Sequence, residues 1–494
     1  MKSKLLILLF FSCQLWAQTS TEIINRGNGA EPDSLDIHQA QGLNSHNILM
    51  DMYEGLMTFD AYGKPQYGVV VNHEVNNTMT DWTFYLNPLA KWSDGQEITA
   101  SDFINSWNDA IKPSTAAPYR QLFDNLIKNN VLQVHSPNKH QLIVKLNQAD
   151  YGFLNKLVLP IFYPKPQHTD QKHISNGAYM LKKWDIQERI TLQKNPYFHA
   201  AKTVKTEQIN YWVTENQNSE LLRFRAAQLD ITETIPDNKI NWLKTYLPQE
   251  LRIAPYYGTF FLGLNLNHKN LSNLHLRQAL SMAIDRNILV EKVLKSGQLP
   301  ATQIIPTQNS KNPQGGFDLK AAKQLLKLSQ FNPKTQQIEL LYNNSANQKK
   351  VALAVAAMWR QNLGIKTKLR NQEWKVFVNT RRGNKKQVFR SGWIADYHDP
   401  LNFLELFQSH SHFNFYGFNN EFYDQIITNI QHTQEHSKLN DLISKAEQIL
   451  AEQLPVIPLY HYVSRHLVST DIQGFNNNPM DRHLSRYLEK LKVN

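Results

Sequence analysis

The chain has 494 residues, a formal net charge of +11 and a single cysteine. A chain of this length supports two or three domain-sized cores. Its lysines and arginines are scattered, with only short clusters, and no nucleic-acid-binding motif is present, so nucleic acid is not expected as a partner. The G-x-S-x-G, P-loop and H-E-x-x-H patterns are absent as well, so we do not expect an enzyme.

The amino terminus has the pattern of a secretory signal peptide. Lys2 and Lys4 precede the apolar run 5–11, and the small residue Ala17 stands just before the sequence becomes polar. The apolar run is too short to cross a membrane as a helix. We therefore expect residues 1–17 to be a cleavable signal peptide and the remaining chain to be exported and soluble.

The only cysteine lies inside this segment and allows a second interpretation. Cys13 could be a lipid-attachment cysteine, but Phe10 and Phe11 before it fit a lipobox poorly. If residues 1–17 are removed, the mature chain has neither a disulfide nor a thiol for catalysis or metal binding.

The first predicted elements alternate between strand and helix. Trp82–Leu86 is rich in aromatic residues and predicts a strand. Thr99–Asp102 predicts a helix start, because apolar residues at helical spacing follow it. An apolar stripe then predicts one helix over Leu276–Leu294, ending near Gly297.

The carboxyl-terminal half continues the same alternation. A helix is predicted from about Lys349 to Asn362, followed by a strand at Ile365–Leu369. A last helix is predicted over Ser437–Glu452, before a buried strand, Val456–Leu459, that is bounded by proline. Strands and helices that alternate on this scale indicate an α/β protein.

One segment, Arg390–Pro400, carries the chemistry that is most informative about function. It places Asp396 among Trp393, Tyr397 and an arginine. A carboxylate framed by aromatic side chains can hold a cationic group such as the amino terminus of a peptide. The alternative is a solvated or helix-capping aspartate, which is the commoner role of an acid in a loop.

Seven segments give the chain a resemblance to a known family. They are EPDSLDIHQAQG from Glu31, DMYEGL from Asp51, KWSDGQEITASDF from Lys91, NGAYML from Asn176, LRQALSMAIDRNILV from Leu276, NQEWKVFVNTR from Asn371 and GWIADYHDP from Gly392. In their order and spacing, the chain resembles the extracytoplasmic solute-binding proteins of the peptide-importer class, family 5, and most of all its periplasmic oligopeptide-binding branch.

The resemblance implies an α/β fold with two lobes that close like a clamshell, and an additional small domain. Lobe I would combine residues 18–52, 164–257 and 465–494. The small accessory domain would be 53–163, and lobe II would be 258–464. The ligand would lie between the lobes.

The resemblance also implies roles for individual residues. Asp396 matches the carboxylate that receives the peptide's ammonium group, which needs a charged partner once it leaves water. Gly392, Trp393 and Ile394 match a segment that offers main-chain groups to the ligand, held as an added strand. Residues 41–43, Gln41-Gly42-Leu43, match the segment on its other side.

Other implied positions concern the pockets and the far end of the ligand. Aromatic positions of the family are matched by Trp374, Trp393, Tyr119 and Tyr256. Arg381 and Arg390 match arginines near the ligand's carboxyl end, where a guanidinium can form two hydrogen bonds to a carboxylate. Gln348 stands in place of a histidine, and Gly263 in place of an acid, so the preferred ligand length is expected to differ from that of relatives.

The sequence therefore predicts a periplasmic, monomeric binding protein without a cofactor. It would capture short peptides and deliver them to a membrane-embedded ABC-type peptide importer. Two alternatives remain open at this point. One is a carrier of murein (cell-wall) tripeptide, and the other is an exported metal-binding protein or enzyme that uses loop residues His398, Asp399, His410 and His412.

Overall fold

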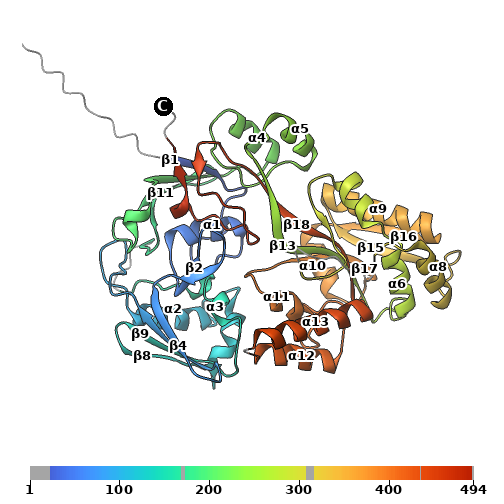
Figure 1. Cartoon of the computed structure of the whole chain (residues 1–494), viewed down its shortest axis with the longest axis horizontal. Coiled ribbons are helices and arrows are strands. Elements are labelled where there is room, and N and C mark those ends of the chain that lie inside the picture. The colour runs from blue at the N-terminus through green and yellow to red at the C-terminus, as the bar shows by residue number, and fades with distance from the viewer. Residues whose placement is uncertain (1–22, 168–172, 307–315, 434, 492–494) are drawn as a thin grey trace, which may run out of the picture.

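The computed structural model describes residues 23–167, 173–306, 316–433 and 435–491 (Figure 1). The predicted signal peptide, 1–17, and Cys13 lie outside the described residues. The described chain is a mixture of helices and sheets, which confirms the predicted α/β class. None of the helices in these ranges is long and apolar enough to cross a membrane.

The first sheet lies beside both ends of the described chain. Its strands follow the order β1 (Ile23–Gly27), β12 (Gln208–Trp212), β11 (Arg189–Lys194) and β10 (Tyr179–Asp185). β1 is parallel to β12, and the other pairs are antiparallel. Helix α1 (Leu43–Met52) packs against β10.

The last part of the chain completes this first body of the molecule. The Arg26 guanidinium donates hydrogen bonds to the carbonyl oxygen of His483 and to Ser485 Oγ, both at 2.7 Å. The backbone N–H of Ser485 donates to Asp51 Oδ1 at 2.8 Å. Residues at the two ends of the sequence are therefore joined through buried polar groups.

The second sheet is antiparallel, in the order β4 (Val70–Val75), β5 (Asp81–Leu86), β9 (Gln141–Lys145) and β8 (Val134–Asn138). Alternate residues of β5 are buried, which confirms the predicted strand. Helix α2 (Ala100–Ile111) begins as predicted, because the Thr99 backbone N–H donates to Asp102 Oδ2 at 2.8 Å and so caps it.

The third sheet is mixed and has the order β14 (Leu299–Pro300), β18 (Val456–Leu467), β13 (Leu251–Leu264), β17 (Val388–Ile394), β15 (Gln337–Asn343) and β16 (Lys366–Gln372). Packed around it are α6 (Leu274–Met282), α8 (Leu319–Leu328), α9 (Ala346–Leu363), α10 (Trp374–Arg382), α11 (Leu401–Leu404), α12 (Glu421–Gln431) and α13 (His436–Gln453). The predictions at Lys349–Asn362, Ile365–Leu369 and Ser437–Glu452 are thus confirmed by α9, β16 and α13.

Smaller elements complete the described chain. They are β2 (Met57–Phe59), β3 (Pro65–Tyr67), η1 (Arg120–Leu126), β6 (Ile127–Lys128), β7 (Val131–Leu132), α3 (Phe153–Lys156), η2 (Pro160–Phe162), η3 (Ala201–Thr203), α4 (Gln217–Arg225), η4 (Asp237–Lys239), α5 (Ile240–Tyr246), α7 (Arg286–Ile288), η5 (Leu289–Leu294), η6 (Glu405–Phe407), β19 (Ile472–Gln473), η7 (Ser485–Tyr487) and β20 (Glu489–Lys490).

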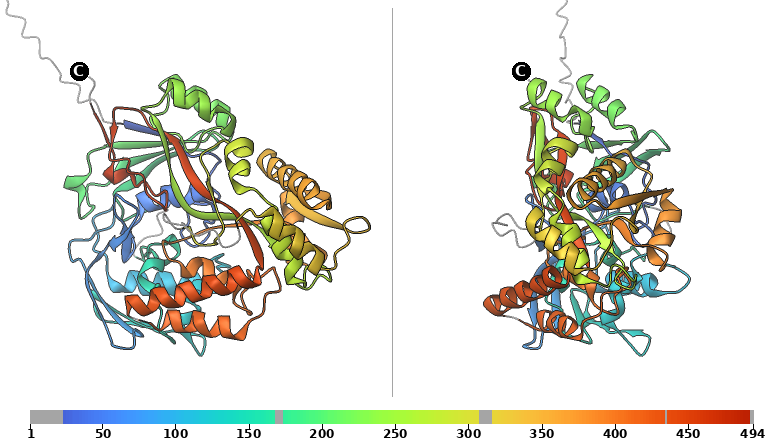
Figure 2. Two further views of the ribbon diagram at one scale, coloured as in Figure 1. Left: turned by 45° about the vertical axis from the view of Figure 1, so that its right-hand side comes forward. Right: turned by 90° about the vertical axis from the view of Figure 1, so that its right-hand side faces the viewer.

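Two long strands, β13 and β18, connect the two halves of the molecule. They run antiparallel from the pair Leu251 and Leu467 to the pair Gly263 and Val456. One end packs with α4 and α5 above the first sheet, and the other lies inside the third sheet (Figures 1 and 2). The chain therefore forms two lobes joined by a two-stranded crossing, as the resemblance implies.

The predicted helix over Leu276–Leu294 is wrong as one continuous helix. α6 ends at Met282, and Asp285 starts a new helical segment because its Oδ1 accepts the Ile288 N–H at 3.0 Å. The buried Arg286 side chain donates to the carbonyl oxygens of Ala301 and Pro458, each at 2.8 Å, and fixes this break against β18. The Asp285 cap therefore divides the predicted helix into two segments, although its apolar stripe is continuous.

The strand Val456–Leu459 is also longer than predicted. β18 continues to Leu467, and Pro458 lies within it rather than at its end. Pro458 stands opposite Phe261, at a shift in the pairing of β13 and β18. A proline is tolerated at such an irregularity because no regular backbone hydrogen bond is lost there.

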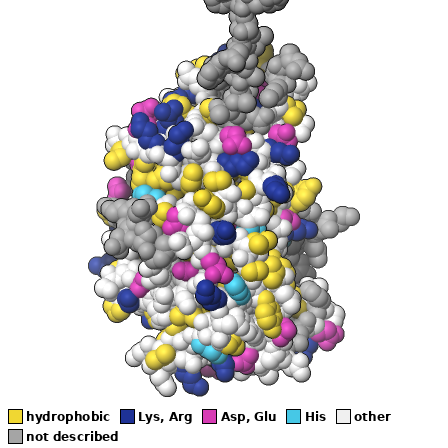
Figure 3. Space-filling view, turned by 90° about the vertical axis from the view of Figure 1, so that its left-hand side faces the viewer, with side chains coloured by type: hydrophobic (Ala, Val, Ile, Leu, Met, Phe, Trp, Pro, Cys, Tyr) yellow, Lys and Arg dark blue, Asp and Glu magenta, His cyan; other side chains and the backbone are white. Residues whose placement is uncertain are grey.

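Charged side chains are distributed over the surface rather than gathered. On the face shown in Figure 3, lysine and arginine side chains are interspersed with aspartate and glutamate. This agrees with the scattered basic residues of the sequence.

Candidate ligand-binding site

A cavity of about 1140 Å³ lies between the small antiparallel-sheet region and the segment that follows β17. One wall is formed by residues 118–150, and the other by residues 393–431. Four predicted site residues line it: Gln41, Tyr119, Trp393 and Asp396. Segments that are far apart in the sequence thus enclose one space of the size that small ligands occupy.

Asp396 is a half-buried carboxylate in the wall of this cavity. Among the described residues, no hydrogen bond or ion pair reaches its side chain; its backbone N–H donates to Asn402 Oδ1 at 3.3 Å. Burial raises the pKa of Asp396 to about 6, against a smaller opposing effect of the Arg482 cation. The site therefore holds a carboxylate that a ligand cation would stabilise in its charged form.

Trp393 forms the aromatic wall predicted beside this carboxylate. Its indole Nε1–H donates to Asn402 Oδ1 at 2.6 Å, and its ring meets the Phe413 ring edge to face at 5.0 Å. Asn402 therefore fixes both the tryptophan and the backbone of Asp396. Tyr397 is more deeply buried, but it lines the same cavity as Trp393 and Asp396.

Tyr119 and Gln41 close the cavity from the opposite lobe. The Tyr119 hydroxyl donates to the Gln41 carbonyl oxygen at 3.5 Å. Burial, with a further contribution from Asp396, raises the pKa of Tyr119 to about 12, so the phenol stays neutral. The Tyr119 hydroxyl therefore adds no negative charge to this wall of the cavity.

The end of β17 presents unpaired main-chain groups. Gly392, Trp393 and Ile394 pair with β13 on one side, whereas β15 pairs with β17 only at Val388 and Phe389. The backbone N–H of Ala395 donates to Tyr257 O, and successive residues of an antiparallel strand turn their backbone groups to opposite sides. The N–H and C=O of Gly392 and Ile394 therefore face the edge that β15 does not cover.

Arg381 and Arg390 lie close together, as the resemblance implies. The Arg381 guanidinium stands 4.7 Å from the centre of the Phe415 ring, and that of Arg390 stands 5.6 Å from the Phe260 ring. Burial, and then repulsion by Arg390 and Arg382, are the causes that lower the pKa of Arg381. Two neighbouring half-buried guanidiniums form a region that favours an anion.

A second cavity of about 790 Å³ adjoins this cationic region. It is lined by Arg382 and Lys386, and it shares Gln121, Arg382, His412 and Phe413 with the larger cavity. Lys386 is only 4% exposed, and burial together with Arg381 lowers its pKa to about 8. The two connected cavities thus place an acid at one end and cations at the other.

The remaining predicted residues are more dispersed. Leu43 and Tyr256 line a small cavity beside Arg482, not the large one. Gln348 lies in the first turn of α9, and its Oε1 is buried without a hydrogen-bond partner among the described residues. Trp374 begins α10, but its side chain lies outside the described residues.

Sequence reasoning missed Arg482 and Lys386. Arg482 acts electrostatically on Asp396, Tyr119 and Tyr256, although it comes from the carboxyl-terminal segment. No local pattern links it to Asp396, because only the return of the chain end to the crossing brings them together. Lys386 could have been noticed as the cation between Arg381 and Arg390.

The loop histidines do not gather into a metal centre. Asp399 instead caps α11, with its Oδ1 accepting the Leu401 N–H at 2.9 Å. His410 and His412 line the large cavity. Within the described ranges, the group of three potential ligands that meets within 4.8 Å is elsewhere, at His466, Asp481 and His483.

Two lobes, a two-stranded crossing and a cavity between the lobes define a solute-binding protein of the clamshell class. A family model for bacterial extracellular solute-binding proteins, family 5 (middle), matches residues 64–415. The chain is also 34% identical over 498 residues to the periplasmic oligopeptide-binding protein OppA of Salmonella typhimurium, covering 92% of this chain and 90% of that protein. The chain therefore belongs to family 5 of the bacterial extracellular solute-binding proteins.

Solved structures agree with this assignment. The murein tripeptide binding protein MppA of Escherichia coli has a TM-score of 0.81 at 30% identity, covering 96% of this chain and 99% of that chain. The complex of Haemophilus influenzae OppA with RPPGFSPFR has a TM-score of 0.78 at 30% identity, with the same coverage. Members of the family are binding proteins of transport systems.

Proposed function

We propose that this protein captures short peptides in the periplasm and delivers them to an ABC-type peptide importer, without catalysing a reaction. The observation that carries this proposal is the half-buried carboxylate of Asp396 in the wall of the large cavity, which forms no ion pair with any part of the chain that the structure describes. A free α-ammonium group placed there would remove the cost of holding that carboxylate away from water.

The open edge of β17 supports a peptide rather than another cation. An extended peptide that starts at Asp396 can add to Gly392 and Ile394 as a strand, with hydrogen bonds that do not depend on its side chains. Lys386, Arg381 and Arg390 supply the positive charge that the peptide's carboxyl end requires.

Ligand binding would be coupled to closure of the lobes. In this proposal lobe I is 18–52, 164–257 and 465–494, the accessory domain is 53–163, and lobe II is 258–464, so that β13 and β18 form the crossing. A ligand that contacts Tyr119 on one side and Asp396 on the other gains its full contacts only when the lobes are closed. It would thereby shift the population toward the form that the importer recognises.

Titration calorimetry with alanine tri- to pentapeptides tests the proposal. We expect saturable binding that acetylation of the peptide's amino end weakens by at least about 30-fold, the effect of removing one partner of a buried charge pair. Asp396→Asn should weaken binding of the free peptides to the same degree, whereas Asp441→Asn, at an exposed site on α13, should not. Equal affinity for free and acetylated peptides would overturn the assignment of Asp396.

A second candidate ligand is the murein tripeptide, because the E. coli protein named for that ligand is among the similar structures. It would use the same ammonium site. Mass spectrometry of ligands that copurify with the protein, followed by competition between alanine peptides and murein tripeptide, separates the two. Binding that a chelator abolishes would instead support the exported metal carrier.

A further inference from the structure

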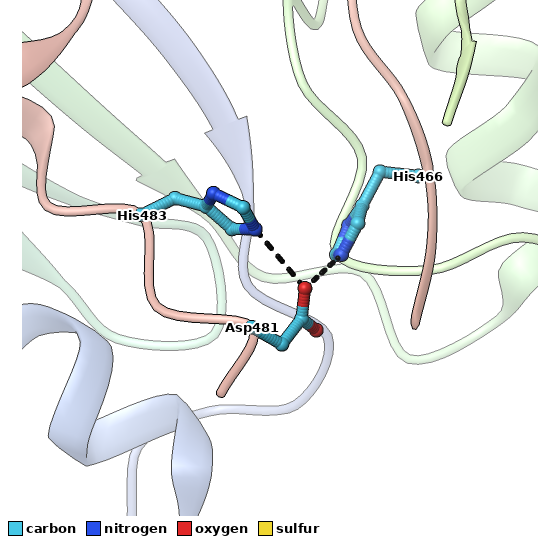
Figure 4. Close-up of side chains that lie close together, drawn as sticks. All are labelled: His466, Asp481 and His483. Carbon is cyan, nitrogen blue, oxygen red and sulfur yellow. Dashed lines mark hydrogen bonds and ion pairs between the residues drawn. The ribbon is translucent and has the colours of Figure 1, made fainter. Parts of the chain in front are cut away.

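Two histidines and an aspartate meet in the interior, outside the proposed peptide site (Figure 4). His466 Nε2 lies 2.9 Å from Asp481 Oδ1, and His483 Nε2 lies 3.0 Å from the same oxygen. His466 belongs to β18, and the other two residues belong to the carboxyl-terminal segment. Both imidazoles are buried, and the Asp481 side chain is 19% exposed. Three potential ligands thus converge from two segments on one point.

The surroundings hold these ligands in place. His466 Nδ1 lies 2.9 Å from the backbone oxygen of Thr232, and a ring that donates there presents Nε2 to the cluster. Asp481 has a left-handed backbone conformation, with φ of 53°, which turns its carboxylate toward both rings. The Phe475 ring stacks on His483 at 3.7 Å. Such support is typical of metal-ligating histidines, whose second nitrogen is fixed by an acceptor.

We infer that His466, Asp481 and His483 form a binding site for one divalent transition-metal cation, such as Zn²⁺. Two imidazole nitrogens and one carboxylate oxygen are a common set of protein ligands for zinc. A small cavity of about 40 Å³, lined by the three residues with Glu233 and Tyr256, adjoins the cluster and has room for a water molecule as a further ligand.

The charges around the cluster set how tightly a cation is held. Burial alone lowers the pKa of His466, but the Asp481 carboxylate and the Thr232 carbonyl raise it to about 9. Burial lowers the pKa of His483 to about 4, so this ring is neutral. The two rings and the carboxylate that lies between them thus interact with one another directly.

Some charged groups near the cluster favour a bound cation, and others disfavour it. The Glu233 carboxylate interacts electrostatically with His466 and favours a cation. Arg26, close to His483, disfavours it, as does Arg482 on the wall of the same small cavity. Arg465 is itself paired with Asp237. Since these effects oppose one another, we expect micromolar rather than nanomolar affinity.

Calorimetric titration of the untagged mature protein with ZnCl₂, after removal of bound metal by a chelator, tests the site. We expect saturable binding of one Zn²⁺ per chain. The double variant His466→Gln/His483→Gln should bind at least about tenfold more weakly. The control double variant His135→Gln/His275→Gln, at exposed positions, should bind as the parent does.

Folding of each variant is checked by circular dichroism. Crystals of the unaltered protein soaked in ZnCl₂ provide a test that needs no variant, because anomalous diffraction should place zinc between the three side chains. Zinc found only elsewhere, no saturable binding, or loss of binding in the control variant alone would overturn the inference. Peptide binding is measured separately, so the outcome does not depend on the proposed function.

Discussion

At the scale of single residues, the Asp396 carboxylate is placed to bind a cationic ligand, but its negative charge destabilises the ligand-free protein. The pKa of this carboxyl is raised from 3.8 to about 6 by burial. A raised carboxyl pKa means that folding favours the protonated acid. The penalty for keeping the charged acid in the fold is absent below about pH 4 and complete above about pH 6.

We therefore expect Asp396→Asn to raise the thermal stability of the ligand-free protein at pH 7.5. The gain should be on the order of 1–2 kcal/mol after allowance for the partial exposure of the side chain, and it should vanish near pH 4. Differential scanning calorimetry at both pH values measures it. A variant that is less stable than the parent at pH 7.5 would mean that Asp396 has a structural partner.

The same pKa sets the pH dependence of peptide binding. The ammonium group requires the ionised carboxylate, so the dissociation constant should rise about tenfold for each pH unit below about 6 and stay level from there to about pH 7, above which the peptide's amino group begins to lose its proton. Acetylated peptides, which do not use this charge, provide the control and should show no such trend.

The residue scale is also where prediction from sequence was least complete. Asp396, Trp393, Tyr119 and Gln41 were predicted and line one cavity. Arg482 was not predicted. It acts on Asp396 only because the carboxyl-terminal segment returns to this part of the fold, and no local sequence pattern indicates that return.

At the scale of elements, the two sides of β17 have different roles. One side pairs with β13 and stabilises the fold, and the other is open at its end for a peptide. Ile394 N–H faces the uncovered edge, whereas Ser391 lies opposite Phe261 and turns its backbone groups toward β13. Ile394→Pro should therefore weaken peptide binding about three- to tenfold, the effect of one hydrogen bond, with little loss of stability. Calorimetry and thermal unfolding measure the two effects.

Ser391→Pro is the matched variant and should give the opposite result. It removes a hydrogen bond inside the sheet, so it should destabilise the fold by about 3 kcal/mol or more. If Ile394→Pro destabilised the fold equally, the edge would be paired within the protein and not open to a ligand.

Elements with strong local signals were predicted well. β5, with its alternating burial, begins and ends close to the predicted positions, and α2, with its capping Thr99, begins where predicted. The prediction of one helix over Leu276–Leu294 was wrong because the apolar stripe continues through the position where the helix breaks. The cap by Asp285 and the buried Arg286 depend on the contact with β18.

At the scale of the whole molecule, a polar contact links the accessory region to the segment after β17. Asn155 Nδ2 donates to Asp399 Oδ2 at 3.3 Å, and the Tyr151 ring packs against the neighbouring apolar core. These contacts lie at the end of the cavity, near Lys156 and Glu405. They hold the two walls of the cavity together.

Asn155→Ala should shift the ligand-free protein toward an open form. Loss of one hydrogen bond should reduce peptide affinity about two- to tenfold, because less of the protein is closed before binding. Small-angle X-ray scattering should show a larger radius of gyration without ligand and the parental value with it. Asn108→Ala, an exposed residue whose amide bonds only within α2, should change neither quantity.

The contact of Arg26 with the segment 483–485 has a consequence for the order in which the molecule is assembled. The first sheet begins with β1 near residue 23, but the groups that satisfy Arg26 and Asp51 come from residues 483–485, more than 400 positions later. Contacts of such long sequence separation form slowly. The first sheet and α1 therefore gain these partners only after the segment 483–485 has been synthesised, which delays their folding and so suits a polypeptide that is exported unfolded.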